Sequence, residues 1–539
     1  MNRRVILVGG TGAFGERLAR LLSQWPQIEL VIAARGLPRA EALARELGCQ
    51  AAGFDRDHPE TLQTLAPWAV IDAAGPFQQG DLRLAQRAIT LGAHYIDIAD
   101  GRRFVAAFAE ALDAPAKAAG VLAVTGASST PALSNAALDA MTRDWAAIDV
   151  AKVAISPGAR APRGLSVVRA ILSYVGRPVA VFSGGGWRWE AGWSGLVRMD
   201  FPGLGRRLVS LCETPDLDIM ARRVRREARF LAGLELAPLH VGLWLLAWLP
   251  RALLVRSLEP LAEPLRAIAD YLAPWGTDRG GMVVEAQGEG ADGLARVARW
   301  SLAAEENAGP TVPVAAAAAV LRGLLAERIT QRGAQPCVGL VTLDQIMAEL
   351  AGLPVMTRLD GGLGEPTLLR TVLGEDVERL PEPVAAVHDK VAARTFMGRG
   401  RAGGSRHWFV RVLRALVGLP EPGAYPRISV TIAPEPGGET WLRDFGPRRF
   451  RSHLRKVSAP RQFEERFAPV RFRFSPHLRD DGFDWRLASW SLLGIPLPKS
   501  WAPQIRATSF ARDGVYRFRA LTAHKWLGVV FAYRGRLDV

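Results

Sequence analysis

The chain has 539 residues and a formal net charge of +15. Because one hydrophobic core seldom grows beyond about 250 to 300 residues, this length predicts two to four domains. The three cysteines, Cys49, Cys212 and Cys337, lie far apart and form neither a disulfide set nor a metal-ligand spacing. We therefore expect a cytoplasmic protein without a metal site. Since a strand is predicted from Val5 onward, we expect no signal peptide.

The positive charge is concentrated in the last third of the chain. Residues 361–539 contain 30 Lys and Arg against 17 Asp and Glu, which accounts for +13 of the total. A basic domain of this kind can bind nucleic acid or an anionic membrane surface. Most of these cations are arginines spread along strand-like runs, with no RNP-type motif or zinc finger beside them. We therefore expect a solvated strand face and no nucleic-acid partner.

A glycine-rich turn follows the first predicted strand. The apolar run from Val5 leads directly into GTGAFG, which is followed by the helix-forming ERLARLLSQW. Gly10 permits a tight turn, Gly12 lets the backbone approach a pyrophosphate, and Gly15 lets the helix pack closely on the sheet. The helix N-terminus offers N–H groups to the anion. This pattern predicts a dinucleotide site formed by Gly10, Thr11, Gly12, Ala13, Phe14 and Gly15.

The second predicted strand, at 30–34, is followed by Arg35. In NAD-binding domains this position holds Asp or Glu for the ribose 2′-hydroxyl, whereas an arginine favours a 2′-phosphate. We therefore predict NADP as the cofactor.

Residues 1–130 alternate strands and helices as a Rossmann-type doubly wound sheet does, with further strands at 49–54, 69–72, 95–98 and 121–125. Such a sheet binds its ligand beyond the carboxyl ends of its strands. We expect Asp55 to meet the adenine end of the cofactor. The segment Ala74, Gly75 and Pro76 is expected to contact the nicotinamide half.

Four segments in order resemble successive blocks of the saccharopine dehydrogenase-like oxidoreductase family. They are GGTGAFG, AAGPFQQG at 73–80, GAHYIDIADG at 92–101 and GASSTPALSNAAL at 126–138. The similarity continues more thinly to about residue 350, and it implies NADP-dependent hydride transfer. Family members that act on amino acids have Asp and His in the last block, which this chain lacks. The family also contains trans-acting enoyl reductases of lipid assembly.

Residues 131–351 are predicted to form an inserted α/β domain for substrate binding and dimerisation, with a helix from about Pro313 that Thr311 caps. Residues 236–250, LAPLHVGLWLLAWLP, carry no formal charge when His240 is neutral. A helix of this length reaches only about 22 Å and cannot cross a hydrocarbon core of about 30 Å. It is interpreted either as an interfacial anchor, with the arginines at 222–229 beside it, or as a buried helix at a dimer interface or an apolar cavity. The sequence favours the buried helix.

A glycine-bearing stretch at 352–364 is predicted as a linker, and 365–539 as an antiparallel β-rich α+β domain. A helix is expected at 384–395. Strands are expected at 427–433, 440–445, 469–474, 483–487, 516–521 and 526–533. LGED at 373–376, ETWLRDFG at 439–446 and LLGIPLP at 492–498 resemble an uncharacterised domain family that occurs fused behind saccharopine dehydrogenase-like modules.

Hydride transfer needs a proton donor or acceptor near the reacting carbon. Tyr95 and Asp97 lie two residues apart at the end of one strand, hence on one face, and form the predicted catalytic pair. The alternative for Asp97 is a helix cap or a loop clamp. Asp100 and the hydroxyls at 128–130 are further candidates.

We expect an NADP-dependent oxidoreductase that acts on a hydrophobic or lipid-like small molecule, with enoyl reduction as one such reaction. The alternatives are a non-catalytic NADP-sensing or lipid-interacting scaffold and an amino-acid dehydrogenase that acts on a C–N bond. Peripheral contact with the inner face of a membrane through residues 236–250, and a homodimer, are further expectations.

Overall fold

In this computed structural model, residues 3–539 are described except 79, 163, 253, 293–294, 364–366, 390–393, 406, 436, 468–469 and 493. The chain divides into two compact units. The first contains residues 1–286 and 297–361, and the second contains residues 287–296 and 362–539.

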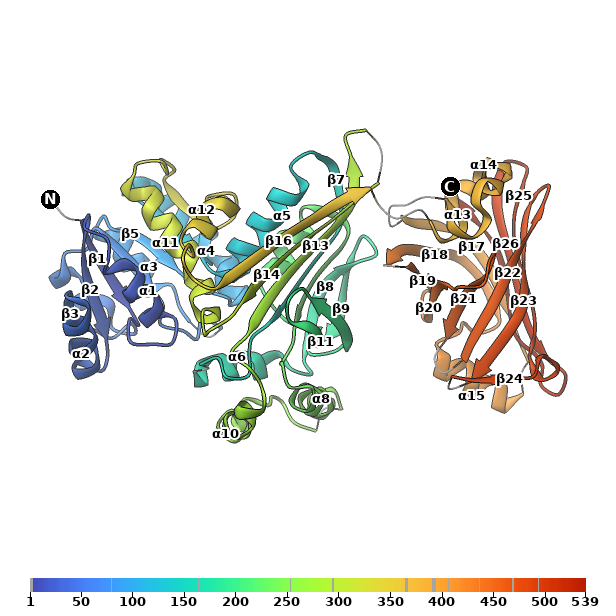
Figure 1. Cartoon of the computed structure of the whole chain (residues 1–539), viewed down its shortest axis with the longest axis horizontal. Helices are drawn as coiled ribbons and strands as arrows, with labels where there is room; N and C mark the ends of the chain where they lie inside the picture. The colour runs from blue at the N-terminus through green and yellow to red at the C-terminus, as the bar shows by residue number, and fades with distance from the viewer. Residues whose placement is uncertain are drawn as a thin grey trace. The chain divides into compact units, whose positions relative to one another are not determined.

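The first unit begins with a seven-stranded parallel sheet in the order β15-β6-β5-β4-β1-β2-β3 (Figure 1). Its strands are β1 (Arg3–Val8), β2 (Ile28–Ala34), β3 (Gln50–Gly53), β4 (Ala69–Asp72), β5 (His94–Asp97), β6 (Leu122–Thr125) and β15 (Gly333–Pro336). Its helices include α1 (Gly15–Leu22), α2 (Leu37–Leu47), α3 (Arg83–Thr90) and α4 (Arg102–Ala118). The order from β3 to β6 is that of a Rossmann-type doubly wound sheet, so the predicted fold is confirmed.

The seventh strand, β15, comes from far along the chain. It follows α11 (Val312–Leu325), whose alanine-rich run is almost entirely buried, and it pairs with β6. The chain therefore leaves the first sheet after β6 and returns to it at β15. A domain boundary at residue 130, as predicted, separates β15 from the sheet in which it pairs. The helix begins close to Pro313 as predicted, but Thr311 makes no side-chain capping hydrogen bond.

A mixed nine-stranded sheet forms the rest of the first unit, with the main order β10-β11-β12-β7-β13-β14-β16 and with β8 and β9 beside β12. The strands are β7 (Trp145–Ser156), β8 (Pro178–Ser183), β9 (Trp187–Ala191), β10 (Val197–Phe201), β11 (Gly205–Leu211), β12 (Val224–Ala232), β13 (Gly280–Gly290), β14 (Ala295–Ala304) and β16 (Val355–Leu363). The helices include α5 (Ser134–Thr142), α6 (Leu165–Tyr174), α7 (Asp216–Ala221), α8 (Ala237–Leu246), α9 (Trp248–Arg251), α10 (Ala262–Leu272) and α12 (Leu343–Ala348). The inserted α/β domain is thus confirmed.

The stretch predicted as a linker and boundary, 352–364, contains the boundary between the two units at residues 361 and 362, but most of it is a strand rather than a loop. Residues 355–363 form β16, which is almost entirely exposed and pairs with β14 at the end of the sheet. Its two glycines and its charged residues are typical of a loop, but the edge of an existing sheet offers hydrogen-bond partners to the backbone. Residue 364 lies outside the described residues.

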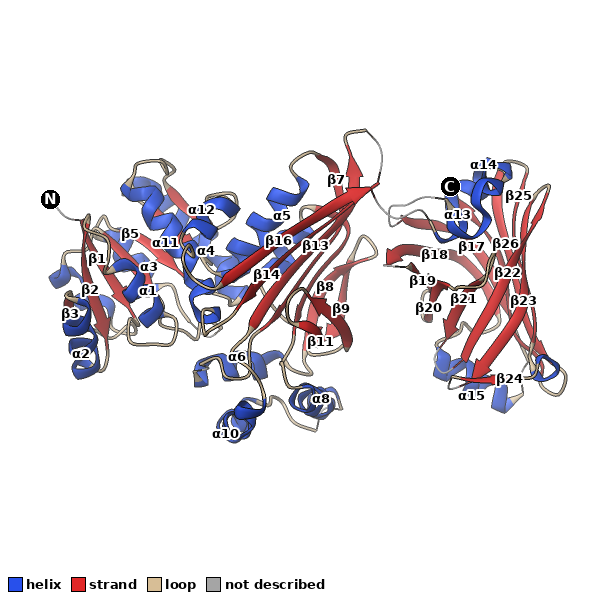
Figure 2. Cartoon of the chain, viewed as in Figure 1, coloured by secondary structure: helices blue, strands red, loops and turns tan. Residues whose placement is uncertain are grey.

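The second unit is an eleven-stranded antiparallel sheet in which β22 pairs with both β21 and β23. This double pairing closes the sheet into a barrel, and strands dominate the unit in Figure 2. The strands are β17 (Arg394–Gly403), β18 (Gly423–Glu435), β19 (Gly438–Asp444), β20 (Arg449–Lys456), β21 (Phe463–Phe467), β22 (Val470–Arg479), β23 (Gly482–Leu492), β24 (Ile495–Leu497), β25 (Gln504–Arg512), β26 (Val515–His524) and β27 (Gly528–Asp538). The helices include α13 (Leu368–Leu373), α14 (Glu382–His388) and α15 (Trp408–Val417).

The barrel core is aromatic, with Phe474, Phe483, Trp485 and Tyr516 among its buried side chains. The six predicted strands are confirmed, and so is the antiparallel β-rich α+β class. The helix expected at 384–395 is shorter than predicted. It ends at His388, residues 390–393 lie outside the described residues, and Arg394 already begins β17.

Candidate active site

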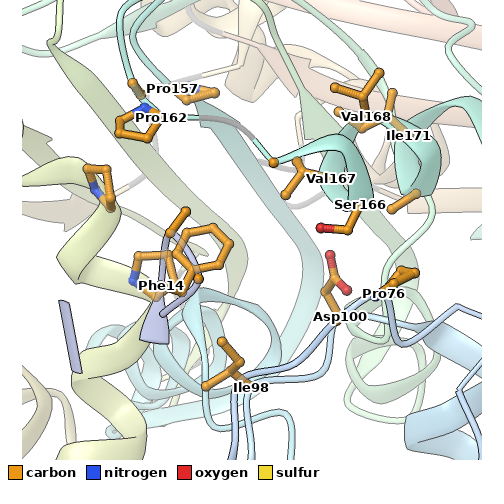
Figure 3. A pocket seen from close by; sticks show the side chains of 18 of the residues that line it. Phe14, Pro76, Ile98, Asp100, Pro157, Pro162, Ser166, Val167, Val168 and Ile171 are labelled. Atoms are coloured by element: carbon orange, nitrogen blue, oxygen red, sulfur yellow. The ribbon is translucent and has the colours of Figure 1, made fainter. Parts of the chain in front are cut away.

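A cavity of about 1440 Å³ opens beyond the carboxyl ends of β1 and β4 in the first unit. This is the point where the strand order reverses, which is where doubly wound sheets bind their ligands. The turn after β1, the loops after β2, β3 and β4, and the helices α6, α8 and α10 all contribute to its wall. Figure 3 shows part of this lining.

The glycines of the first turn have distinct positions. Gly9 has a φ of +75°, and a Cβ atom there would lie 2.8 Å from the backbone nitrogen of Ala74. Gly10 is buried, and its Cβ would lie 2.8 Å from the side chain of Ile32. The tight turn expected of Gly10 therefore belongs to Gly9, because the sequence pattern does not show which glycine takes the left-handed conformation.

Gly12 and Gly15 occupy the positions predicted for them. A Cβ at Gly15 would collide with the carbonyl group of Gly9, so only glycine lets α1 pack this close to the turn. Gly12 is exposed to the cavity, and its Cβ would meet only the Gly9 carbonyl oxygen, at 3.2 Å. Gly12 thus leaves open space at the cavity surface.

The turn forms a cradle that fits a pyrophosphate. Thr11, Gly12, Ala13 and Phe14 line the cavity, and no side chain caps the N-terminus of α1. The first N–H groups of a helix need partners, and an anion supplies them.

Two arginines lie at the end of the cavity next to β2. Arg35 and Arg39 both line it and both are exposed, and Arg39 Nη2 donates to the Thr11 carbonyl oxygen at 3.3 Å. Asp55 lines the same region, where its Oδ1 accepts from the Asp57 N–H at 3.0 Å. The sequence analysis did not predict Arg39, which lies in the first turn of α2 and lines the same end of the cavity as Arg35.

The end of β4 combines a lining segment with a buried ion pair. Ala74, Gly75 and Pro76 line the cavity as predicted. Beneath them the fully buried Asp72 carboxylate accepts from Arg56 Nε at 2.7 Å, and the Tyr95 hydroxyl donates to it at 3.2 Å. Burial raises the pKa of Asp72, and the Arg56 guanidinium opposes this rise. The Tyr95 hydroxyl therefore points to Asp72.

Asp97 holds two loops together. Its side chain is fully buried, and its Oδ1 accepts from the Ala99 N–H, the Thr125 hydroxyl and the Gly126 N–H at 2.8 to 2.9 Å. Burial raises the pKa of this carboxyl to about 7. Neither Asp97 nor Tyr95 lines the cavity. The geometry matches the loop-clamp alternative, and the catalytic role of this pair stays a prediction without geometric support.

Asp100 lines the cavity, unlike Asp97. Its side chain and that of Ser166, from α6, point toward one another in Figure 3. Gln78 Nε2 donates to Asp100 Oδ1 at 3.0 Å. The residue is exposed to the cavity, and desolvation by the surrounding protein raises the pKa of its carboxyl, against the opposing effect of the Gln78 hydrogen bond.

The loop after β6 adds three hydroxyls to the wall, from Ser128, Ser129 and Thr130. The Thr130 hydroxyl donates to Asp216, a fully buried carboxyl at the start of α7. Burial raises the pKa of Asp216 to about 7. This contact joins the first sheet to the inserted domain beside the cavity.

The far part of the cavity is apolar. Among the described lining residues of α6, α8 and α10, Arg266 is the only charged side chain. The apolar side chains on these helices include Val167, Val168, Ile171, Leu239, Leu243, Leu246, Leu265 and Ile268. We call this part the apolar chamber.

The uncharged segment 236–250 forms α8 and most of α9. One face of α8 lines the apolar chamber, as the cavity interpretation predicts, while Leu245 and Trp248 are exposed. The arginine flank expected upstream is largely engaged in ion pairs, because Arg223 pairs with Asp139, Arg226 with Asp149 and Arg229 with Glu190. Among the described residues, no helix combines the length and the hydropathy that a bilayer crossing requires.

The residues that form the cradle match a known family of cofactor-binding domains. Residues 5–124 match the saccharopine dehydrogenase NADP binding domain. The first sheet, from β1 to β6, is thus similar to this NADP-binding domain. Residues 380–537 match a domain of unknown function, DUF4166, which confirms the second resemblance. The glycine turn, the two arginines and the lining after β4 all lie within the matched residues.

Several solved structures resemble about two thirds of this chain at low sequence identity. Apo saccharopine dehydrogenase (L-Glu forming) from Saccharomyces cerevisiae is 14% identical, covers 67% of this chain and 100% of its own, and gives a TM-score of 0.49. The DAP dehydrogenase of C. glutamicum in complex with DAP is 16% identical, with 64% and 98% coverage and a TM-score of 0.36. An engineered D-amino acid dehydrogenase bound to NADP+ is 15% identical, with 65% and 99% coverage and a TM-score of 0.36. No curated protein sequence matches the chain.

Replacing Arg35 by Ala is expected to reduce the preference for NADP(H) over NAD(H). A hydrogen bond to a charged group contributes about 1.5 to 3 kcal/mol, so the NADPH affinity should fall roughly 10- to 100-fold while the NADH affinity stays unchanged. Titration calorimetry with both cofactors measures this, and Arg39→Ala shows how much the second arginine contributes. Equal losses for both cofactors would mean that Arg35 does not contact the 2′-phosphate.

Proposed function

We propose that the chain is an NADP-dependent oxidoreductase that transfers a hydride between the nicotinamide and a large apolar substrate. The observation that carries this proposal is the continuity of the cavity, which runs from the NADP cradle into the apolar chamber between α6, α8 and α10. Its volume of about 1440 Å³ exceeds the usual range of ligand pockets, roughly 300 to 1,000 Å³, so a second molecule has room beside the cofactor.

The composition of the apolar chamber favours an apolar substrate over an amino acid. An amino acid brings a carboxylate and an ammonium group, and both need charged or hydrogen-bonding partners when water is removed. Arg266 is the one cation that the described lining of α6, α8 and α10 offers. Alkyl chains gain free energy when such a surface removes them from water.

The chain's own residues have separate tasks in this proposal. Thr11 to Phe14 and Arg35 bind and orient the cofactor, which supplies or accepts the hydride when bound. Asp100 lies at the side of the cavity that Ser166 faces, where desolvation raises the pKa of its carboxyl, and it is the group we assign to proton transfer. For reduction of a carbon–carbon double bond, Asp100 would donate the proton to the carbon that does not receive the hydride.

The test is an assay of NADPH oxidation with 2-enoyl thioesters of increasing chain length and with a total lipid extract. We expect turnover that rises with chain length, because each additional methylene buried in the apolar chamber contributes about 0.8 kcal/mol. NADPH binding without turnover of any lipid would favour the scaffold alternative. Turnover of free amino acids alone would favour the amino-acid dehydrogenase.

A substitution at Gly242 tests the apolar chamber itself. Gly242 lies within α8 and lines the cavity, and a Cβ atom there meets no neighbour within 4 Å. Gly242→Phe is therefore expected to fill the apolar chamber and to lower kcat/KM for long substrates at least tenfold, with NADPH affinity unchanged. Gly242→Ala is the matched control and should keep full activity. If the phenylalanine variant is as active as the alanine variant, the substrate lies elsewhere.

A homodimer, and peripheral membrane contact through the exposed Leu245 and Trp248, remain proposals for this unit. Leu245 and Trp248 are exposed beside the wall of the apolar chamber, and this position supports the membrane contact. A lipid-like substrate would then have a short path from the bilayer into the cavity.

A further inference from the structure

One end of the C-terminal barrel gathers three segments that are far apart in the sequence. They are α15, residues 494–503 before β25, and the turn 525–527 between β26 and β27. The Ser405 N–H, just before α15, donates to the Val529 carbonyl oxygen at 2.7 Å. Gln504 at the start of β25 pairs with Ala523 at the end of β26. We call this surface the α15 end; Figure 1 labels α15 and β24 there.

Large apolar side chains are exposed on the α15 end. Trp526 is 78% exposed, Ile495 64% and Trp501 60%. Trp408 and Val412 on α15 and Val529 on β27 are also exposed. Single exposed apolar residues are common, but a group of them on one surface marks a place where a partner binds.

The α15 end is also positively charged. Arg411, Lys499 and Lys525 are exposed on its three segments, and Lys525 Nζ lies 4.3 Å from the ring centre of Trp526. Residues 403–420, 485–512 and 514–537 contain no Asp or Glu. The adjacent Glu421 lies 3.6 Å from Arg414 and 3.7 Å from Arg448, so its charge is compensated.

The opposite end of the barrel carries charges of both signs. The turns there contain Asp480 and Asp481 between β22 and β23, and Asp513 between β25 and β26. The 3-10 helix Gly374–Arg379, between α13 and α14, adds Glu375 and Asp376. Three of these acids form ion pairs with arginines at the same end, because Arg461 pairs with Asp376, Arg479 with Asp481 and Arg512 with Asp513. The α15 end, whose three segments contain no Asp or Glu, is therefore the end that an anionic surface attracts.

We propose that the α15 end docks the protein on a bilayer that contains anionic lipid. Tryptophan at the headgroup level, aliphatic side chains just below it and Lys or Arg beside them are the combination that suits a membrane interface. A nucleic acid satisfies the cations and can stack on tryptophan, but it gives no gain for exposed Ile495, Val412 and Val529. The aliphatic side chains therefore favour lipid.

Vesicle co-sedimentation of the full chain tests this docking. We expect binding to vesicles of phosphatidylcholine mixed with phosphatidylserine, weaker binding to phosphatidylcholine alone, and partial release by salt. Lys499→Gln combined with Lys525→Gln should lower the partition coefficient roughly 25-fold, about fivefold for each cation. Trp501→Ala combined with Trp526→Ala should lower it about tenfold or more on both vesicle types.

The control variants carry the same substitutions elsewhere. Arg512→Gln removes an exposed cation at the opposite end of the barrel, and Trp189→Ala removes an exposed tryptophan from β9 in the first unit. Neither is expected to change the partition coefficient. NADPH affinity should be the same in all these variants, because none of the substitutions lies at the cofactor cradle. An unchanged NADPH affinity also shows that the first unit of each variant is folded.

Three results would overturn the proposal. The first is a wild-type chain that ignores anionic vesicles. The second is a loss of vesicle binding when Leu245→Asp and Trp248→Asp are combined, while the lysine and tryptophan variants of the α15 end still bind. The membrane contact would then lie on α8 and α9. The third is a wild-type chain that binds duplex DNA but not vesicles, together with weaker DNA binding by the lysine variant. This result would assign the α15 end to nucleic acid.

Discussion

Asp100→Asn is expected to lower kcat about 100-fold or more while NADPH still binds with wild-type affinity. Positioned proton transfer contributes about 10²- to 10⁴-fold to a rate, and an amide keeps the shape of the carboxyl but has no transferable proton. Steady-state kinetics with the substrate found by the lipid assay measures kcat, and nicotinamide fluorescence measures binding. Asp278→Asn, at another acid that lines the cavity, is the matched control and should keep its activity.

The pH profile gives a second readout of Asp100. In the direction of reduction the protonated carboxyl is the active form, so kcat should be high below the pKa of Asp100 and fall as the pH rises through it. Desolvation raises this pKa, so the fall should occur at a higher pH than for an ordinary Asp. Asp100→Asn should remove this limb. An unchanged profile in the variant would assign the proton to another group.

Gly12→Val and Gly9→Val are expected to fail in different ways. Gly12 faces the cavity with only one close backbone neighbour, so a valine there should leave a folded protein that has lost detectable NADPH binding, because its branches occupy the space of the pyrophosphate. Gly9 has a φ of +75° and packs against the backbone of Ala74. A valine there should lower the free energy of unfolding by about 3 kcal/mol or more.

Circular dichroism during thermal unfolding and NADPH fluorescence separate the two effects. Gly36→Val is a suitable control, since Gly36 also lines the cavity and its Cβ has no neighbour within 4 Å. Retained NADPH affinity in Gly12→Val would mean that this glycine does not approach the phosphates. Normal stability in Gly9→Val would contradict the close packing of the turn.

The first sheet could be predicted from the sequence because its evidence is local. Each strand from β1 to β6 is an apolar run before a turn or a helix, and the glycine turn is specific in its spacing. The return of the chain to this sheet through α11 and β15 has no such signal, since the alanine-rich helix is compatible with any buried site. The closure of the barrel could not be predicted from the sequence either. The pairing of β22 with β23 is a local hairpin, but the closure that it completes depends on strands that are far apart in sequence.

The candidate site shows the same division. The cofactor residues follow strand ends, and the sequence indicates these ends directly. The predicted catalytic pair followed from strand alternation, which places Tyr95 and Asp97 on one face but does not show whether that face is covered. Here Thr125, Gly126 and Asp72 bind the two side chains beneath the cavity. Asp100 lies beyond the strand, where alternation ends and the path of the loop decides the direction of the side chain.

The central claim, hydride transfer between NADP and an apolar substrate, is tested most directly by isotope transfer. The purified chain is incubated with a total lipid extract and with NADPH that carries deuterium as its transferable hydride, and the extract is analysed by mass spectrometry. The structure predicts deuterium in an apolar product, formed by the wild type and by Asp278→Asn but not by Asp100→Asn. Deuterium in no lipid at all, or only in a water-soluble amino acid, would contradict the account.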